Sequence, residues 1–225
     1  MLKRHFTSKF AAMRKYLLLL LFIIIAFYSN GQVKVACVGN SITYGSGIEN
    51  RDKNSYPAKL QALAGEDWQV KNFGVSGATM LKKGDKPYWQ QEAFREALIF
   101  EPDVVIIKLG TNDTKPQNWQ YADQYISNYL DMIEQFKTLS SQPKIFICLP
   151  VPAFEEHWDI IPSVVKKEVV PAVRKIARKT DTHLINLYKP FKKKSELFPD
   201  HIHPNAAGAA LMAEIIYDHL QKHVN

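Results

Sequence analysis

The protein has 225 residues, of which 46% are hydrophobic and 23% are charged, and its formal net charge is +7. This composition excludes a collagen, a coiled coil and an intrinsically disordered chain, and the length predicts one domain or at most two small ones. A net positive charge raises the question of an anionic partner such as nucleic acid, so its location along the chain matters.

The first 31 residues hold five of the seven excess positive charges, because they contain no Asp or Glu. An apolar run at 17–28 follows the basic residues, and small residues follow the run. This order predicts a secretory signal peptide over 1–31, with either Met1 or Met13 as its start. A membrane anchor is the alternative, but the run is shorter than the roughly 20 residues that a spanning helix needs. We expect a periplasmic or secreted protein of residues 32–225, with no membrane contact after cleavage and no nucleic-acid partner.

Short apolar runs alternate along 32–225 with stretches of helical periodicity. We expect strands at 33–38, 68–73, 104–109, 144–149 and 183–187. We expect helices between the cap Ser55 and the stop signal Gly65, over 89–100, 118–139 and 163–180, and after the cap Asn205, with Pro171 kinking the fourth. Alternating strands and helices predict an α/β fold, a three-layer α/β/α sandwich around a five-stranded parallel sheet.

Three residues are unusual for the strands in which they lie. Cys37 and Cys148 fall in apolar runs, so we expect two buried thiols, although export would permit a disulfide. Lys108 interrupts the third strand, which predicts either an ion pair with a carboxylate such as Asp113 or a position near a site at the sheet end.

Polar segments at 39–45, 72–79, 110–113 and 200–205 follow predicted strands. Ligands bind at the carboxyl ends of strands in such sheets, so these segments predict one shared site. The glycines do not fit a phosphate-binding loop or a dinucleotide fingerprint. They do not fit the nucleophile elbow of α/β-hydrolases either, since Thr43 stands where its second glycine belongs.

The four segments resemble the sequence blocks of the SGNH hydrolases, also called GDSL esterases. Ser41 matches the nucleophile of the first block, Gly77 the glycine of the second, and Asn112 the third. His203, with Asp200 three residues earlier, matches the last. Gly74 is an alternative for the second block, and Asn40 departs from the usual Asp before the nucleophile. The resemblance implies a flavodoxin-like fold over 32–225, and neither a cofactor nor a metal.

The chemistry of acyl transfer explains these residue types. A serine hydroxyl needs an adjacent base, which His203 supplies, and Asp200 can orient the imidazole. The resemblance assigns the oxyanion hole to the Ser41 amide, the Gly77 amide and the Asn112 side chain. Taken singly, these are also ordinary turn and cap residues. A metal site on His201 and His203 is less favoured, because no further ligand cluster stands out.

The aromatic residues of the loops are candidates for substrate contact: Tyr44, Trp89, Trp119, Phe154 and Trp158. Aromatic faces pack against sugar rings, although several of these side chains could simply cover the core. The loops offer no long apolar run for a fatty acyl chain, which favours acetate. The resemblance extends to exported bacterial sialate and carbohydrate O-acetylesterases.

We therefore expect a carboxylic ester hydrolase that acts on acetylated carbohydrate. A lysophospholipase or thioesterase is the alternative enzyme, and an inactive sugar-binding module is the alternative outside catalysis. The oligomeric state is left open.

Overall fold

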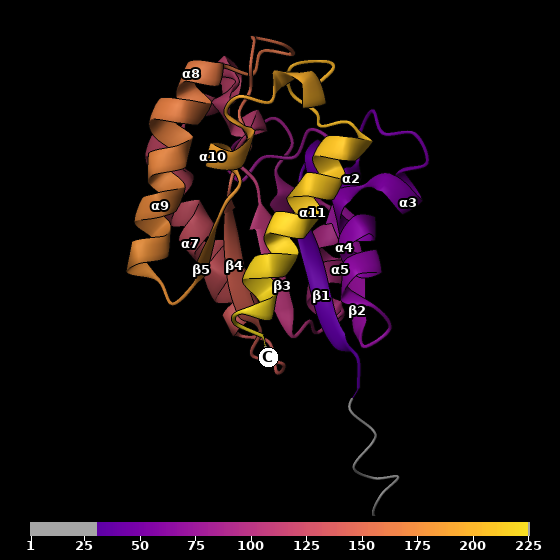
Figure 1. The fold of residues 1–225 in the computed structure, drawn as a ribbon. Helices are drawn as coiled ribbons and strands as arrows, with labels where there is room; N and C mark the ends of the chain where they lie inside the picture. The colour runs from indigo at the N-terminus through magenta and orange to yellow at the C-terminus, as the bar shows by residue number, and fades with distance from the viewer. Residues whose placement is uncertain (1–30, 225) are drawn as a thin grey trace, which may run out of the picture. The chain divides into compact units, whose positions relative to one another are not determined.

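The computed structural model describes residues 31–224, and its centre is a sheet of five strands. The strands are β1 (Val33–Gly39), β2 (Trp68–Gly74), β3 (Val104–Lys108), β4 (Lys144–Leu149) and β5 (His183–Asn186). They lie in the order β2-β1-β3-β4-β5, and all neighbouring pairs are parallel (Figure 1). The α/β prediction is confirmed. Apart from Gly31, the predicted signal peptide lies outside the described residues.

Helices connect the strands and cover both faces of the sheet (Figure 1). The helices are α2 (Ser41–Tyr44), α3 (Arg51–Asn54), α4 (Tyr56–Ala64), α5 (Glu92–Ile99), α6 (Pro116–Trp119), α7 (Tyr125–Lys137), α8 (Pro162–Val164), α9 (Val170–Lys179), α10 (Tyr188–Phe191) and α11 (Ala206–Gln221). Within residues 31–224, no helix has both the length and the apolar character that crossing a bilayer requires.

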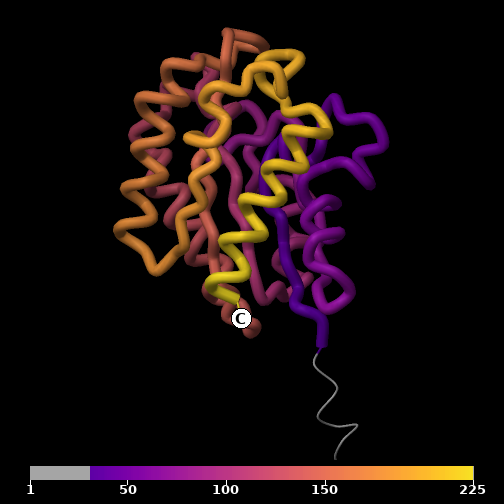
Figure 2. The backbone as a smooth tube through the Cα atoms, viewed as in Figure 1, coloured from indigo at the N-terminus to yellow at the C-terminus, as the bar shows by residue number. Residues whose placement is uncertain are grey.

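Alternate residues of each strand point to opposite faces, so the sheet separates two apolar cores. Val35 and Cys37 pack on the face covered by α4 and α11, and Val105 and Ile107 pack on the face covered by α5, α7 and α9. Figure 2 shows α11 running across the first of these faces. Cys37 and Cys148 are both buried free thiols, as expected.

Three predicted helices are shorter in the structure than in the sequence pattern. The one predicted at 89–100 begins at Glu92, after a 3₁₀ turn over Tyr88–Gln90. The one predicted at 118–139 begins at Tyr125, because two short helical turns precede it. The one predicted at 163–180 contains a π-helical stretch, Val165–Val169, just before Pro171. Proline has no N–H to donate to the preceding turn, so the regular α-helix resumes only there.

Lys108 ends β3 and lies on the same face of the sheet as Val104 and Ile106. Its side chain is buried, and its Nζ has no hydrogen-bond partner among residues 31–224. The expected ion pair with Asp113 does not form, because that carboxylate accepts backbone N–H groups instead. Burial lowers the pKa of Lys108 to about 8. A cation at this position therefore destabilises the fold.

We expect the substitution Lys108→Met to raise the free energy of unfolding by about 3 kcal/mol near neutral pH. The pKa of Lys108 in the folded chain, about 8, is below its ordinary value of 10.5, so the wild type regains this stability as the pH rises through that window. Urea unfolding of both proteins at about pH 7 and about pH 10 measures the effect. A difference between them that does not shrink at the higher pH contradicts this account of Lys108.

Candidate active site

The four polar segments meet at the carboxyl ends of the strands, at the upper end of the sheet in Figure 1. They line one cavity of about 300 Å³ with side chains or backbone of Ser41, Gly77, Asn112 and His203. Ser41 follows β1, Gly77 follows β2 and Asn112 follows β3, and His203 lies just before α11. The topology of the sheet thus brings together residues that are far apart in the sequence.

Ser41 is the first residue of α2, directly after β1 and Asn40. The Asn40 side chain caps this helix, since its Oδ1 accepts the backbone N–H of Ile42 at 3.1 Å. Asparagine and aspartate offer the same oxygen to a helix N-terminus, which explains how Asn40 replaces the Asp expected before the nucleophile. The N–H of Ser41 has no acceptor within its own helix, because it belongs to the first turn.

Ser41, His203 and Asp200 form a hydrogen-bonded chain. Ser41 Oγ lies 2.8 Å from His203 Nε2, and His203 Nδ1 lies 2.8 Å from Asp200 Oδ2. Because an ionised carboxylate only accepts hydrogen bonds, Nδ1 carries the imidazole proton and Nε2 accepts the hydroxyl proton of Ser41. Ser41 is nearly buried, with 7% of its surface exposed. The arrangement places a base directly on a serine hydroxyl.

Asp200 is held in place by its own turn. Its Oδ1 accepts the backbone N–H groups of Ile202 at 2.9 Å and His203 at 2.6 Å. Burial raises the pKa of Asp200, but these backbone bonds, together with the hydrogen bond and charge of His203, outweigh burial and lower it. The carboxylate is therefore ionised and aligned with the imidazole near neutral pH.

Gly77 lines the cavity, whereas Gly74 does not. The backbone of Gly77 has a φ of +81°, which only glycine adopts readily. Gly74 has a different role, because a Cβ there would collide with the backbone N of Tyr44 in α2. Of the two candidate glycines, only Gly77 is thus positioned to direct its backbone toward a ligand beside Ser41.

The Asn112 side chain is oriented by the same loop as Gly77. Its Nδ2 donates one hydrogen bond to the carbonyl of Ala78 at 3.0 Å. A side-chain amide has two N–H groups, so the second one remains for a ligand in the cavity. Asn112 is 5% exposed, and a donor in such a site interacts more strongly than one in water.

Sequence analysis considered Asp113 only as a partner for Lys108 and missed that this buried carboxylate joins the two loops. Asp113 accepts the backbone N–H of Leu81 at 2.7 Å and that of Met80 at 3.1 Å. Burial raises its pKa to about 6, against the lowering effect of backbone hydrogen bonds. The only feature of the sequence that could have indicated this role was the position of Asp113 next to Asn112. Asp113 fixes the segment that contains Ala78 against the segment that contains Asn112.

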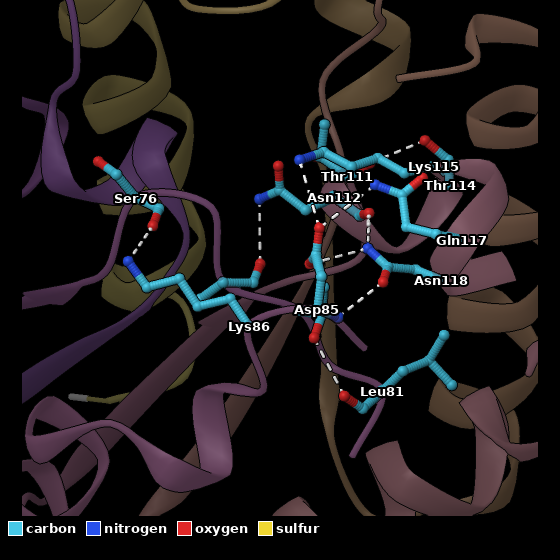
Figure 3. A network of polar contacts seen from close by, with 12 residues as sticks. Ser76, Leu81, Asp85, Lys86, Thr111, Asn112, Thr114, Lys115, Gln117 and Asn118 are labelled. Carbon is cyan, nitrogen blue, oxygen red and sulfur yellow. Dashed lines mark hydrogen bonds and ion pairs between the residues drawn. The ribbon is translucent and has the colours of Figure 1, made fainter. Parts of the chain in front are cut away.

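A second contact between the loops, drawn in Figure 3, was also missed. Asn118 accepts the backbone N–H of Asp85 at 2.7 Å, and its Nδ2 donates to the Asp85 carboxylate at 3.0 Å and to the carbonyl of Asn112 at 2.9 Å. Lys115, which lines the cavity, lies 3.7 Å from the same carboxylate. Asn118 thus ties Asn112 to the segment that contains Asp85, and nothing in the spacing of these residues predicts the contact.

Two of the candidate aromatic residues are hydrogen-bonded away from the cavity. The indole N–H of Trp89 donates to the carbonyl of Met80 at 2.9 Å. That of Trp119 donates to Glu168 at 2.8 Å. Both rings are partly buried against the core on the α7 side of the sheet, and neither lines the cavity. Trp89 and Trp119 therefore cover the hydrophobic core, which was the alternative to substrate contact.

The other three aromatic candidates differ in what their rings contact. Tyr44 is exposed but lies beneath the guanidinium of Arg51, at 4.0 Å from the ring centroid. Phe154 packs on Phe198 with ring centroids 5.1 Å apart. Trp158 alone of the five candidates lines the cavity.

The part of the chain from 31 to 224 contains no group of three or more His, Cys, Asp or Glu side chains that could hold a metal ion. His201 lies 3.6 Å from Glu155 and does not join His203 as a ligand pair.

A larger hollow, of about 730 Å³, lies beside β2 and includes Lys34, Lys71 and Phe100, but no pair of a nucleophile and a base. The chemistry therefore centres on Ser41.

The chain is similar in sequence and in fold to known proteins. The model of the GDSL-like lipase/acylhydrolase family matches residues 37–211. A curated acetylxylan esterase of Xylanibacter ruminicola is 43% identical over an alignment of 202 residues, and the match covers 82% of this chain and 42% of that protein. The chain thus spans less than half the length of this curated relative.

Solved structures share the fold. An acetyl xylan esterase, AlAXEase, aligns with a TM-score of 0.65 at 22% identity, over 83% of this chain and 98% of that one. A carbohydrate acetylesterase family member from Sinorhizobium meliloti aligns with a TM-score of 0.64 at 18% identity, over 84% of this chain and 97% of that one. At these identities the likeness concerns the arrangement of the sheet and its helices.

Proposed function

Since the chain belongs to the GDSL-like lipase/acylhydrolase family, we propose that it is a serine esterase that removes O-acetyl groups from carbohydrate. The observation that carries the proposal is the chain of hydrogen bonds from Ser41 through His203 to Asp200, each 2.8 Å long, at the floor of one cavity. The acetylxylan esterase of X. ruminicola, at 43% identity, supports the choice of an acetylated sugar as substrate.

The reaction begins with attack of Ser41 Oγ on the ester carbonyl carbon, while His203 Nε2 takes the hydroxyl proton. The carbonyl oxygen becomes an oxyanion, which the amides of Ser41 and Gly77 and the free N–H of Asn112 stabilise. His203 then returns the proton to the sugar oxygen, which leaves as an alcohol. Water attacks the acetyl-enzyme by the same proton route and releases acetate.

The size of the cavity favours a small acyl group. Its volume is about 300 Å³, and besides the residues of the reaction it is lined by Ser46, Ser76, Lys115, Trp158 and Ile160. Trp158 and Ile160 make part of this lining apolar, so it is the volume, at the lower end of the range for ligand sites, that favours a short acyl group. Acetate release from acetylated xylan, acetylated pectin fragments and acetylated sialic acid would identify the sugar.

A series of nitrophenyl esters of increasing acyl length tests the acyl preference. We expect kcat/KM to be highest for acetate and to fall toward octanoate. A rate that rises with chain length would favour the lysophospholipase or thioesterase reading and contradict the proposal.

We expect Asn112→Ala to lower kcat by about 10²–10³ with little change in KM, because the lost donor contacts the oxyanion more than the ground-state ester. Steady-state kinetics on 4-nitrophenyl acetate measures both constants. A rise in KM at constant kcat would instead indicate that Asn112 only binds substrate.

We also propose that the protein acts in the periplasm or outside the cell, which the basic and apolar pattern of residues 1–31 supports. Intact-mass measurement of the protein from periplasmic and cytoplasmic fractions tests this. Full-length protein confined to the cytoplasm would contradict it.

A further inference from the structure

Trp158 is a large apolar side chain that remains exposed at the cavity. It is 52% exposed, and its ring centroid lies 5.1 Å from that of His203 at an interplanar angle of 55°. The His157 imidazole contacts the same indole in an edge-to-face arrangement, with 4.0 Å between ring centroids. One side of the indole thus borders the base, while much of its surface is open to a ligand.

The backbone that presents Trp158 is strained. Trp158 and Asp159 have φ values of +50° and +61°, although neither is a glycine. They form a two-residue turn, since the N–H of Ile160 donates to the carbonyl of His157 at 3.0 Å. Turns with two left-handed residues favour Asn and Gly, so a tryptophan here costs free energy. Strain of this kind is characteristic of residues held for function.

The turn is anchored on both sides of Trp158 to the segment that carries His203. Before the turn, the N–H of Phe154 donates to the carbonyl of His201 at 3.0 Å. After the turn, Ile160 packs in a buried cluster with Ile202. Both anchors lie within two residues of His203, so the backbone that presents Trp158 is held beside the imidazole before substrate binds.

The geometry of proton return decides which part of the substrate meets the indole. His203 Nε2 must lie within hydrogen-bond distance of the leaving alcohol oxygen, about 3 Å. The acyl part of the ester points instead toward Gly77 and Asn112, where the oxyanion forms. The ring attached to the leaving oxygen is therefore on the His203 side of the cavity, where Trp158 borders the imidazole.

We infer that Trp158 binds the sugar ring that carries the ester, with the C–H face of the pyranose against the exposed part of the indole. This inference rests on the proposed function, since it names the residue that recognises the leaving group of that reaction. Trp158 thereby sets the preference for an ester on a ring over an ester of a small alcohol.

The test compares two substrates and a matched pair of variants. The substrates are acetylated xylo-oligosaccharide and ethyl acetate, whose leaving alcohol has no ring, with acetate release as the readout. Trp158→Gly removes the indole, while Asp159→Gly changes the neighbouring residue of the same turn. Glycine suits the left-handed backbone at both positions, so both variants should fold, as thermal unfolding checks.

We expect Trp158→Gly to lower kcat/KM for the oligosaccharide at least about tenfold more than for ethyl acetate, and Trp158→Phe to recover part of that preference. Asp159→Gly should leave the ratio of the two rates unchanged. An equal loss on both substrates for Trp158→Gly would overturn the inference and leave the esterase intact. Failure of the wild type to hydrolyse either ester would overturn the proposed function itself.

Discussion

The substitution Ser41→Ala is expected to lower kcat for 4-nitrophenyl acetate by about 10⁶-fold, because it removes the only atom that forms a bond to the acyl group in the proposed reaction. The hydroxyl lies 2.8 Å from His203 Nε2. Without it, His203 can only activate a water molecule, and direct attack by that water does not restore the lost rate. The fold should be unaffected, because alanine favours a helix and Asn40 still caps α2.

Ser46→Ala is a matched control for this experiment. Ser46 also lines the cavity, but its hydroxyl bonds to Ser76 at 2.7 Å and not to a base. We expect this variant to keep most of the wild-type kcat. Comparable losses in the two variants, or a fully active Ser41→Ala protein with a normal melting temperature, would show that the serine of α2 does not carry the reaction.

The substitution Asp200→Asn is expected to lower kcat by about 10⁴-fold with little effect on KM. An asparagine can present its amide N–H to His203 Nδ1, which would place the imidazole proton on Nε2 and leave no base for Ser41. The carboxylate also stabilises the imidazolium that forms during attack. Stopped-flow or steady-state hydrolysis of 4-nitrophenyl acetate measures the loss.

The stability difference between the wild type and Asp200→Asn should depend on pH. The pKa of Asp200 in the folded chain is lower than its ordinary value of 3.8, so its contribution to stability is present above that pH and is lost as the pH falls below it. The stability difference between wild type and Asp200→Asn should therefore narrow in acid. Asp159→Asn, which changes a nearby exposed carboxylate, is the control, and a difference between wild type and Asp200→Asn that does not narrow as the pH falls below 3.8 would contradict the account.

Much of the fold followed from local patterns. The run 104–107 is apolar at every position, and β3 is buried on both faces as a central parallel strand must be. The carboxyl ends of parallel strands share one edge of the sheet, so Ser41, Gly77 and Asn112 could be assigned to one place before any coordinates were known. The helix ends were less predictable, since Pro171 and the π-helical stretch before it depend on packing as well as on propensity.

The parts that sequence did not reveal depend on contacts between distant segments. Asp113 and Asn118 look like ordinary loop residues, yet they bind backbone groups 33 residues away. Of the five aromatic candidates only Trp158 lines the cavity, and a tryptophan does not itself predict the left-handed turn that presents it. Such turns favour Asn, Asp and Gly, so the aspartate is compatible with this turn and the tryptophan is not.

The most direct test of the central claim is the site at which a fluorophosphonate probe reacts, determined by intact mass and peptide mapping. The serine oxygen displaces fluoride from phosphorus when a base activates it, so the probe reports on the pair formed by Ser41 and His203. We predict one adduct per chain, on Ser41, and its loss in Ser41→Ala. An unlabelled protein, or a label on another residue, would contradict the assignment and favour an inactive sugar-binding protein on this scaffold.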